Sequence, residues 1–286
     1  MRRTAFAAGL VLSMLSLPAL AAASARVESV AFQSAYLGRP MPYFVILPPD
    51  YATAPSTRYP VIYLLHGLSD HSSTWTERTN VVDHAAGHRF IVVMPEGEAG
   101  WYTDGAGGAS ARYESYLLDE VIPDVQKRYR TIEEGYARGI AGLSMGGYGS
   151  LKMALKHPDE FALAASMSGS VNAARYTDKD AAGWELHEQS IVRTFGPADS
   201  PTRAANDLFA LLRARPTGRP TTFPYLYLDC GTEDALVAAN RNFAALLTEK
   251  QIPHEFHEIP GIHNWDLWEQ RVRVIFDLAD QKLPRR

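Results

Sequence analysis

Cysteine is almost absent from this sequence, because Cys230 is the only one among 286 residues. A single thiol excludes an intrachain disulfide framework and a zinc site built from several cysteines. A surplus of positive charge is missing as well: 28 Lys and Arg residues stand against 32 Asp and Glu residues, which gives a net charge of −4. Binding to nucleic acid needs a basic stripe that neutralises phosphates, so the composition argues against a nucleic-acid partner.

Long hydrophobic runs are missing too, except at the N-terminus. Residues 5–20 are almost all apolar, follow Arg2 and Arg3, and precede the small residues of 19–25, which offer several A-x-A cleavage sites. This order is typical of a secretory signal peptide. A short membrane anchor is the alternative, although the run is marginal for a span and the small residues favour cleavage. We therefore expect removal of residues 1–25, no stable membrane insertion afterwards, and a periplasmic or secreted mature protein.

Residues 26–286 are predicted to form a single α/β domain, since no linker or repeat divides them. Continuous apolar runs such as 61–65 and 90–94 are typical of strands buried on both faces of a parallel sheet. Their alternation with helical patterns predicts a mostly parallel central sheet with helices on both faces. Strands are expected at 43–47, 61–65, 90–94, 139–143, 161–167, 224–229 and 254–259, and helices at 112–130 (interrupted by Pro123), 147–157, 239–250 and 265–281.

Residues 170–222 break this alternation, because they contain no convincing strand and carry scattered Pro, Gly and charged residues. Long excursions of this kind often form lids or substrate walls. We expect a largely helical insertion before the strand at 224–229, placed over the ends of the strands as a lid or cap that influences the choice of substrate.

The chemistry centres on Gly142-Leu-Ser-Met-Gly146, which fits the pattern G-x-S-x-G. In this motif a sharp turn between a strand and a helix holds the serine in a strained conformation, and the small residues allow close backbone approach. The context fits, because a predicted strand precedes the motif and a predicted helix follows it. Ser144 is therefore the expected nucleophile; a tight packing turn without chemistry is the alternative.

A nucleophilic serine needs a base, and the base needs a carboxylate that orients it. In this architecture the carboxylate follows the serine and the histidine comes last. Asp234 lies in the loop after the strand at 224–229 and is favoured as the carboxylate. Asp229 and Glu233 compete with it, but Asp229 still lies within the strand, and Glu233 is expected to diverge from its neighbour.

The base must lie in a loop that brings its side chain to the serine. His263 lies in the loop 260–265, between the last predicted strand and the last predicted helix, whereas His254 and His257 fall inside a strand pattern. We therefore expect His263 to accept the proton of Ser144 and to return it to the leaving alcohol. A surface histidine or one that caps a helix is the alternative.

The oxyanion of the reaction needs two preorganised N–H donors. The backbone of Met145, directly after the nucleophile, is one candidate. Leu68 is the other, because Gly67 lets the loop after 61–65 turn its backbone toward the site. His66 is then a structural loop residue. The segment from His66 onward is superficially similar to a histidine metal motif, but Leu68 occupies the position of the second histidine, and no metal ligand set is expected.

Five motifs occur in order along the chain: Leu65-His-Gly-Leu68 with Trp75, Gly100-Trp-Tyr-Thr-Asp104, Ala141-Gly-Leu-Ser-Met-Gly-Gly-Tyr148, Gly231-Thr-Glu-Asp234 and Pro260-Gly-Ile-His263. Together they resemble the esterase D family of α/β-hydrolases over about residues 27–280. That family includes S-formylglutathione hydrolases, tributyrin and acetyl esterases, feruloyl esterases and mycolyltransferases. The block at 100–104 is most similar to the small-ester branch.

The resemblance implies an α/β-hydrolase fold, a triad of Ser144, Asp234 and His263, and oxyanion donors at Leu68 and Met145. It also implies that Trp101 and Tyr102 border the acyl pocket; a structural aromatic cluster is the alternative for these two residues.

The expected activity is that of a serine esterase. It would hydrolyse short-chain or carbohydrate-linked acyl esters through an acyl-enzyme, with a small-molecule ester as its partner and no cofactor. The alternatives are an acyltransferase of the mycolyltransferase type, a siderophore esterase, an S-formylglutathione hydrolase and a non-catalytic binding module. The physiological ester and the oligomeric state stay open.

Overall fold

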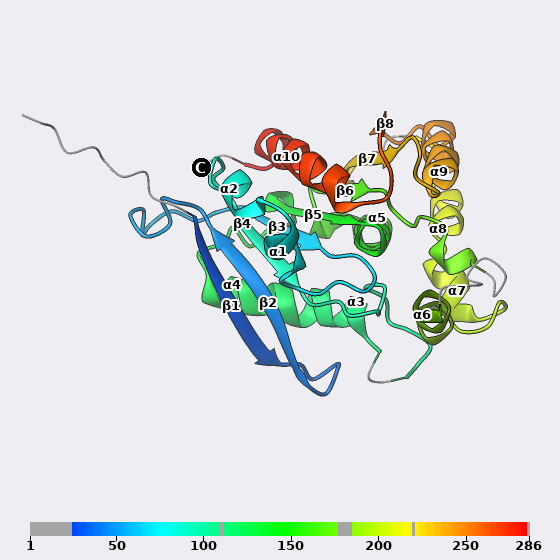
Figure 1. Ribbon diagram of the computed structural model, residues 1–286, viewed down its shortest axis with the longest axis horizontal. Coiled ribbons are helices and arrows are strands. Elements are labelled where there is room, and N and C mark those ends of the chain that lie inside the picture. The colour runs from blue at the N-terminus through cyan, green and yellow to red at the C-terminus, as the bar shows by residue number, and fades with distance from the viewer. Residues whose placement is uncertain (1–24, 109–110, 177–184, 219–220, 285–286) are drawn as a thin grey trace, which may run out of the picture.

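A single β-sheet forms the centre of the protein in the computed structural model (Figure 1). The structure describes residues 25–108, 111–176, 185–218 and 221–284. Within these residues the sheet has eight strands in the order β1-β2-β4-β3-β5-β6-β7-β8. The strands are β1 (Arg26–Gln33), β2 (Pro40–Leu47), β3 (Val61–Leu65), β4 (Ile91–Pro95), β5 (Arg138–Leu143), β6 (Leu163–Met167), β7 (Tyr225–Gly231) and β8 (His254–Ile259).

Helices cover both faces of this sheet (Figure 1). The longer ones are α5 (Met145–Lys156), α6 (Glu185–Phe195), α9 (Val237–Glu249) and α10 (Trp265–Lys282). The shorter ones are α1 (Thr74–Arg78), α2 (Val81–Ala85), α3 (Tyr113–Ser115), α4 (Ile122–Arg128), α7 (Pro201–Asn206) and α8 (Leu208–Ala214), with the π-helix η1 (Tyr116–Val121) and the 3₁₀ turns η2 (Gly135–Ala137), η3 (Pro158–Glu160) and η4 (Ala173–Arg175).

The strand directions confirm the predicted mostly parallel α/β sheet. Only the pairs β1–β2 and β2–β4 are antiparallel, and the pairs from β4 through β3, β5, β6 and β7 to β8 are parallel. Strand β3 is buried along its whole length, with Tyr63 and Leu65 in one hydrophobic core and Ile62 and Leu64 in the other. Because side chains alternate between the two faces of a strand, each face of the sheet has its own core.

Several elements differ from the sequence-based expectation. Strand β1 and the helices α1 and α2 were not expected: β1 alternates exposed and half-buried residues at the edge of the sheet, and each helix has five residues. The helix expected at 112–130 contains the π-helix η1 just before Pro123. Proline has no N–H to continue the α-helical ladder, and a local π segment is one way in which a helix absorbs such an interruption.

The helical insertion before β7 is present in the described part of 170–222, which holds η4, α6, α7 and α8. Helix α8 packs on α5 and α9, and Phe209 meets Phe243 at 5.3 Å between ring centroids. Figure 1 places α6, α7 and α8 together at one end of the molecule. Residues 177–184 and 219–220 of this segment lie outside the described residues, and its role as a lid or cap stays a prediction.

The expected signal peptide falls almost wholly outside the described residues, which begin at Ala25. In the part of the chain that the structure covers, no helix combines the length and the apolar character needed to cross a membrane.

Candidate active site

Ser144 stands at the sharp turn between β5 and α5. Its φ of 52° lies in the left-handed region, which costs a residue with a side chain about 1–3 kcal/mol. The surrounding backbone holds it there: the Ser144 N–H donates to the carbonyl of Met167 at 2.9 Å, and its own carbonyl accepts from the N–H groups of Tyr148 and Ser170. The strain is therefore maintained by β6 and by the first turn of α5.

The two glycines of the motif permit this turn. A Cβ at Gly142 would lie 2.5 Å from the carbonyl carbon of Gly146, and a Cβ at Gly146 would lie 2.6 Å from the carbonyl oxygen of Leu65. Both contacts are with backbone atoms, which cannot swing aside as a flexible side chain can. The close approach that the motif predicts is present at both positions.

Three side chains from separate loops meet at this turn. The Ser144 Oγ–H donates to His263 Nε2 at 3.1 Å, and the His263 Nδ1–H donates to Asp234 Oδ2 at 2.7 Å. Asp234 follows β7, and His263 lies between β8 and α10. The two loops touch, because the N–H of Glu233 donates to the carbonyl of Gly261 at 3.0 Å.

The environment of Asp234 keeps its carboxylate charged. Burial would raise its pKa, but the hydrogen bond and the charge of His263, together with the N–H of Leu236, lower the pKa below its usual range. The Leu236 N–H donates to Oδ1 at 2.8 Å, so the two carboxylate oxygens have separate partners. An ionised carboxylate at Nδ1 orients the imidazole and leaves Nε2 free to accept a proton.

The competing carboxylates lie elsewhere. Asp229 is buried within β7 and pairs with Arg271 of α10 at 2.8 Å, while Glu233 is exposed. The structure therefore brings Asp234 to the serine and turns both competitors away from it.

The competing histidines also lie away from the serine. Both belong to the edge strand β8, where His254 interacts with the carbonyl of Ile252, just before the strand, and His257 lies 2.8 Å from Glu255. Of the three late histidines, His263 is the one that contacts Ser144.

The expected oxyanion donors flank Ser144. Met145 begins α5, so its N–H is one of the first four in the helix, which have no partner within it. The loop that carries Leu68 passes close by, since a Cβ at Gly67 would lie 3.7 Å from Ser144 Cβ. His66 is buried, and its Nδ1 lies 2.7 Å from the carbonyl of Gly67, so its ring binds the backbone of its own loop.

Cys230 is a free, buried thiol in β7. Burial raises its pKa to about 12, so the reactive thiolate is scarce at neutral pH. Over the described ranges, no three His, Cys, Asp or Glu side chains group in a way that could hold a metal ion.

Comparison with known proteins gives matches over most of the chain. The model of the Esterase family matches residues 34–276. The chain belongs to the Esterase family. It is 31% identical over 254 residues to an esterase of Mycobacterium tuberculosis, across 81% of this chain and 54% of that relative. The chain thus spans about half the length of this relative. It is also 26% identical to an acetyl esterase of Caldicellulosiruptor saccharolyticus, across 88% of this chain and 97% of that protein.

Solved structures agree with the family assignment. Fluorophosphonate-binding serine hydrolase F of Staphylococcus aureus superimposes with a TM-score of 0.77 at 27% identity, across 90% of this chain and 99% of that one. An S-formylglutathione hydrolase of the same organism gives a TM-score of 0.75 at 28% identity, with the same coverage. These neighbours confirm the predicted α/β-hydrolase fold and the resemblance to esterases.

In this Esterase-family protein Trp101 is enclosed by other side chains. Its Nε1–H donates to Ser190 Oγ of α6 at 3.0 Å, and its ring packs near Tyr148 and Phe195. These contacts fit the alternative interpretation, in which Trp101 is part of a structural aromatic cluster. A direct contact between Trp101 and an ester stays a prediction.

Tyr102 is enclosed in the same way. Its hydroxyl donates to the carbonyl of His66 at 3.1 Å, and its ring lies so close to Gly97 and Gly149 that a Cβ at either would clash with it. The side chain therefore reaches under the loop that carries Leu68, and its contact with substrate also stays a prediction.

The sequence did not point to Trp268, which packs edge-to-face on His263 at 4.9 Å between ring centroids. Trp265 and Trp75 continue this row, at 5.3 Å and 5.2 Å from ring to ring. The spacing of Trp265 and Trp268, three residues apart at the start of α10, was the available signal, because such pairs share one face of a helix.

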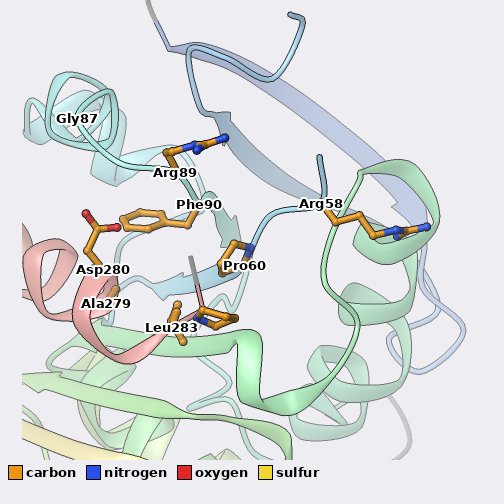
Figure 2. Close-up of a pocket in the computed structure, with 9 residues that line it drawn as sticks. Arg58, Pro60, Gly87, Arg89, Phe90, Ala279, Asp280 and Leu283 are labelled. Atoms are coloured by element: carbon orange, nitrogen blue, oxygen red, sulfur yellow. The ribbon is translucent and has the colours of Figure 1, made fainter. Parts of the chain in front are cut away.

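A cavity of about 370 Å³ lies away from Ser144 (Figure 2). Pro60 and Phe90, which line it, precede β3 and β4, so the cavity adjoins the amino ends of these strands, whereas Ser144 follows the carboxyl end of β5. Ligands of open α/β sheets bind outside the carboxyl ends. Arg89 at the rim pairs with Asp50 at 2.9 Å. The cavity is therefore separate from the candidate active site.

Proposed function

We propose that the protein is a serine carboxylic-ester hydrolase that forms an acyl-enzyme at Ser144. One observation carries the proposal: the continuous contact from Ser144 Oγ to His263 Nε2 at 3.1 Å and from His263 Nδ1 to Asp234 Oδ2 at 2.7 Å, in a member of the Esterase family. Such a contact lets a neutral imidazole remove the proton of an otherwise weak nucleophile.

In the proposed reaction, Ser144 Oγ attacks the ester carbonyl while His263 Nε2 takes its proton. The charge of Asp234 stabilises the imidazolium that forms, and the N–H groups of Leu68 and Met145 donate to the oxyanion. When the tetrahedral intermediate collapses, the C–O bond to the alcohol breaks, and His263 returns the proton to that alcohol. Water then attacks the acyl-enzyme with His263 as base, which releases the acid and restores Ser144.

The proposed substrates are esters of short acyl chains or acyl groups linked to carbohydrate. The similarity to an acetyl esterase along nearly the whole of both chains supports this class. The similarity to an S-formylglutathione hydrolase supports including its thioester substrate among the compounds tested.

The proposal is tested with Ser144→Ala on p-nitrophenyl esters from acetate to palmitate, with methyl ferulate and S-formylglutathione alongside. Loss of the nucleophile should lower kcat by at least about 10³-fold and abolish labelling by a fluorophosphonate probe. Ser29→Ala, at an exposed position of the edge strand β1, is the control and should keep full activity. Full turnover by Ser144→Ala would disprove the mechanism. Labelling of Ser144 without turnover of any compound would indicate acyl transfer or a bulkier substrate.

We also propose that the protein is exported and acts in the periplasm or outside the cell. The pattern of residues 1–25 supports this proposal. Expression of the full chain in a bacterium, followed by N-terminal sequencing of the periplasmic and medium fractions, tests it. A mature N-terminus near residue 26 is expected, and an intact protein confined to the cytoplasm would contradict the proposal.

A further inference from the structure

The loop between β3 and α1 carries the proposed oxyanion donor Leu68, and its preceding carbonyl groups are held by two side chains. The Tyr102 hydroxyl donates to the carbonyl of His66 at 3.1 Å. The His66 Nδ1–H donates to the carbonyl of Gly67 at 2.7 Å. A carbonyl oxygen can only accept, so Nδ1 carries a proton, while His66 Nε2 faces the Gly97 nitrogen at 2.8 Å and Glu96 Oε1 at 3.2 Å.

These contacts fix the direction of two peptide planes. In a trans peptide, the C=O of one residue and the N–H of the next point in opposite directions. Holding the Gly67 carbonyl against the His66 ring therefore turns the Leu68 N–H away from that ring. Holding the His66 carbonyl against Tyr102 turns the Gly67 N–H the other way.

The Leu68 N–H is one of the backbone donors of this loop that have no protein partner among the residues that the structure describes. A buried or half-buried N–H of this kind is normally paired. Because Gly67 lies beside Ser144 Cβ, the unpaired N–H is suited to a ligand atom at the nucleophile.

Tyr102 is itself held rigidly in a strained conformation. Trp101 and Tyr102 have φ values of 52° and 49°. The ammonium of Lys152, which is completely buried, donates to the carbonyl of Tyr102, to Thr103 Oγ1 at 3.1 Å and to Glu114 at 2.7 Å. Strain of this kind persists where the surroundings over-determine the backbone, and it is concentrated at functional sites.

We propose that Tyr102 is a positioning residue of the oxyanion site, which acts through the His66 backbone to aim the Leu68 N–H at the developing negative charge. This inference rests on the proposed function. It differs from the expectation that Tyr102 borders the acyl pocket, because a pocket residue selects among acyl chains, whereas a positioning residue acts equally on all of them.

Tyr102→Phe removes one oxygen atom and leaves the ring that fills the space between Gly97 and Gly149. Complete removal of an oxyanion donor costs about 10²–10³ in kcat, so misaiming one should lower kcat by roughly tenfold or more. The same factor is expected for p-nitrophenyl acetate, butyrate and octanoate, with KM unchanged. The affinity for butaneboronic acid, whose adduct with Ser144 carries the oxyanion, should fall by a similar factor.

Tyr116→Phe is the matched control. Tyr116 is as buried as Tyr102, but its hydroxyl has no hydrogen-bond partner among the described residues. Loss of that hydroxyl should leave kcat, KM and boronic acid affinity unchanged. A thermal melt of both variants checks that they are folded at the assay temperature. His66→Asn tests the other side chain that holds this loop. In the double variant with Tyr102→Phe, the loss of kcat should be smaller than the product of the two single losses, because both side chains position the same backbone.

The outcomes separate this inference from the proposed function. Activity of Ser144→Ala would overturn the function, whatever Tyr102 does. With the function intact, an unchanged kcat in Tyr102→Phe, or a change in acyl-chain preference, would overturn the positioning role. If no ester in the panel is turned over, the rate of fluorophosphonate labelling of Ser144 replaces kcat as the measured quantity. Phosphonylation also places negative charge on an oxygen atom at this site. An unchanged labelling rate in Tyr102→Phe would then refute the inference.

Discussion

Glu96 offers a quantitative test of how the loops around Ser144 are held. The residue is 8% exposed, and its carboxylate joins the loop after β3 to the loop after β4. Oε2 accepts the Ser72 N–H at 2.9 Å, and Oε1 accepts the Glu98 N–H at 2.7 Å. Burial alone would raise the pKa of Glu96, but the interaction with His66 and these N–H groups lower it to about 2.

The sign of the pH effect follows from this direction. A carboxyl group whose pKa is lower in the folded state than in the unfolded chain stabilises the fold at pH values above the unfolded pKa, here 4.5. The stabilisation is lost as the pH falls through the folded pKa of about 2. The gap between the two values corresponds to about 3 kcal/mol at pH 7. Glu96→Gln should therefore lower Tm by roughly 5–10 °C at that pH.

Urea unfolding of both proteins between pH 7 and pH 3 measures the effect. The difference in unfolding free energy should be largest at pH 7 and should shrink to about half or less at pH 3. Glu133→Gln is the control, because that side chain is 61% exposed and faces Arg58 at 3.5 Å, so its change should stay within about 0.5 kcal/mol. Parallel loss of stability by the wild type and Glu96→Gln across this range would refute the reasoning.

Two further substitutions test the packing around the site. Gly146→Ala places a Cβ 2.6 Å from the Leu65 carbonyl oxygen, so it should lower kcat at least about tenfold and destabilise the protein by about 1–3 kcal/mol. Gly139→Ala is the control, because its Cβ would have no contact under 3.6 Å, and it should change neither kcat nor stability. Hydrolysis of p-nitrophenyl acetate and thermal melts measure both effects, and full activity of Gly146→Ala would contradict the steric argument. Lys152→Met removes the buried partner of Glu114 and should lower the free energy of unfolding, measured with urea, by about 3 kcal/mol. The double variant Lys152→Met with Glu114→Leu should regain much of that stability, because no unpaired carboxylate is left buried. A single variant as stable as the wild type would show that the pair contributes nothing to stability.

The sequence was sufficient where one pattern depends on one physical cause. Strand β3 is predicted to the residue, because a run buried on both faces must be continuously apolar. The choice of Asp234 over Asp229, and of His263 over His254 and His257, depends on which residues lie in loops after strands, and the structure brings Asp234 and His263 to Ser144.

The sequence was insufficient where polar groups are buried by distant parts of the chain. Glu96 and Lys152 are charged residues, whose type is usually exposed, and no local pattern reveals that the fold encloses them. Tyr102 was placed at the acyl pocket by resemblance alone, while its hydroxyl contact depends on a loop more than thirty residues away along the chain. The five-residue helices α1 and α2 are too short for a helical period to emerge.

The insertion between β6 and β7 has a consequence for how this protein could diversify. It leaves the sheet from one strand and returns to the adjacent parallel strand, after Ser144 and before Asp234 and His263. A replacement that begins after Ser170, whose N–H holds the Ser144 carbonyl, and rejoins the sheet at β7 keeps the register of the sheet and the contacts among the three side chains. On the prediction that this segment forms a wall of the substrate site, recombination or laboratory grafting would alter that wall while the reacting atoms keep their positions.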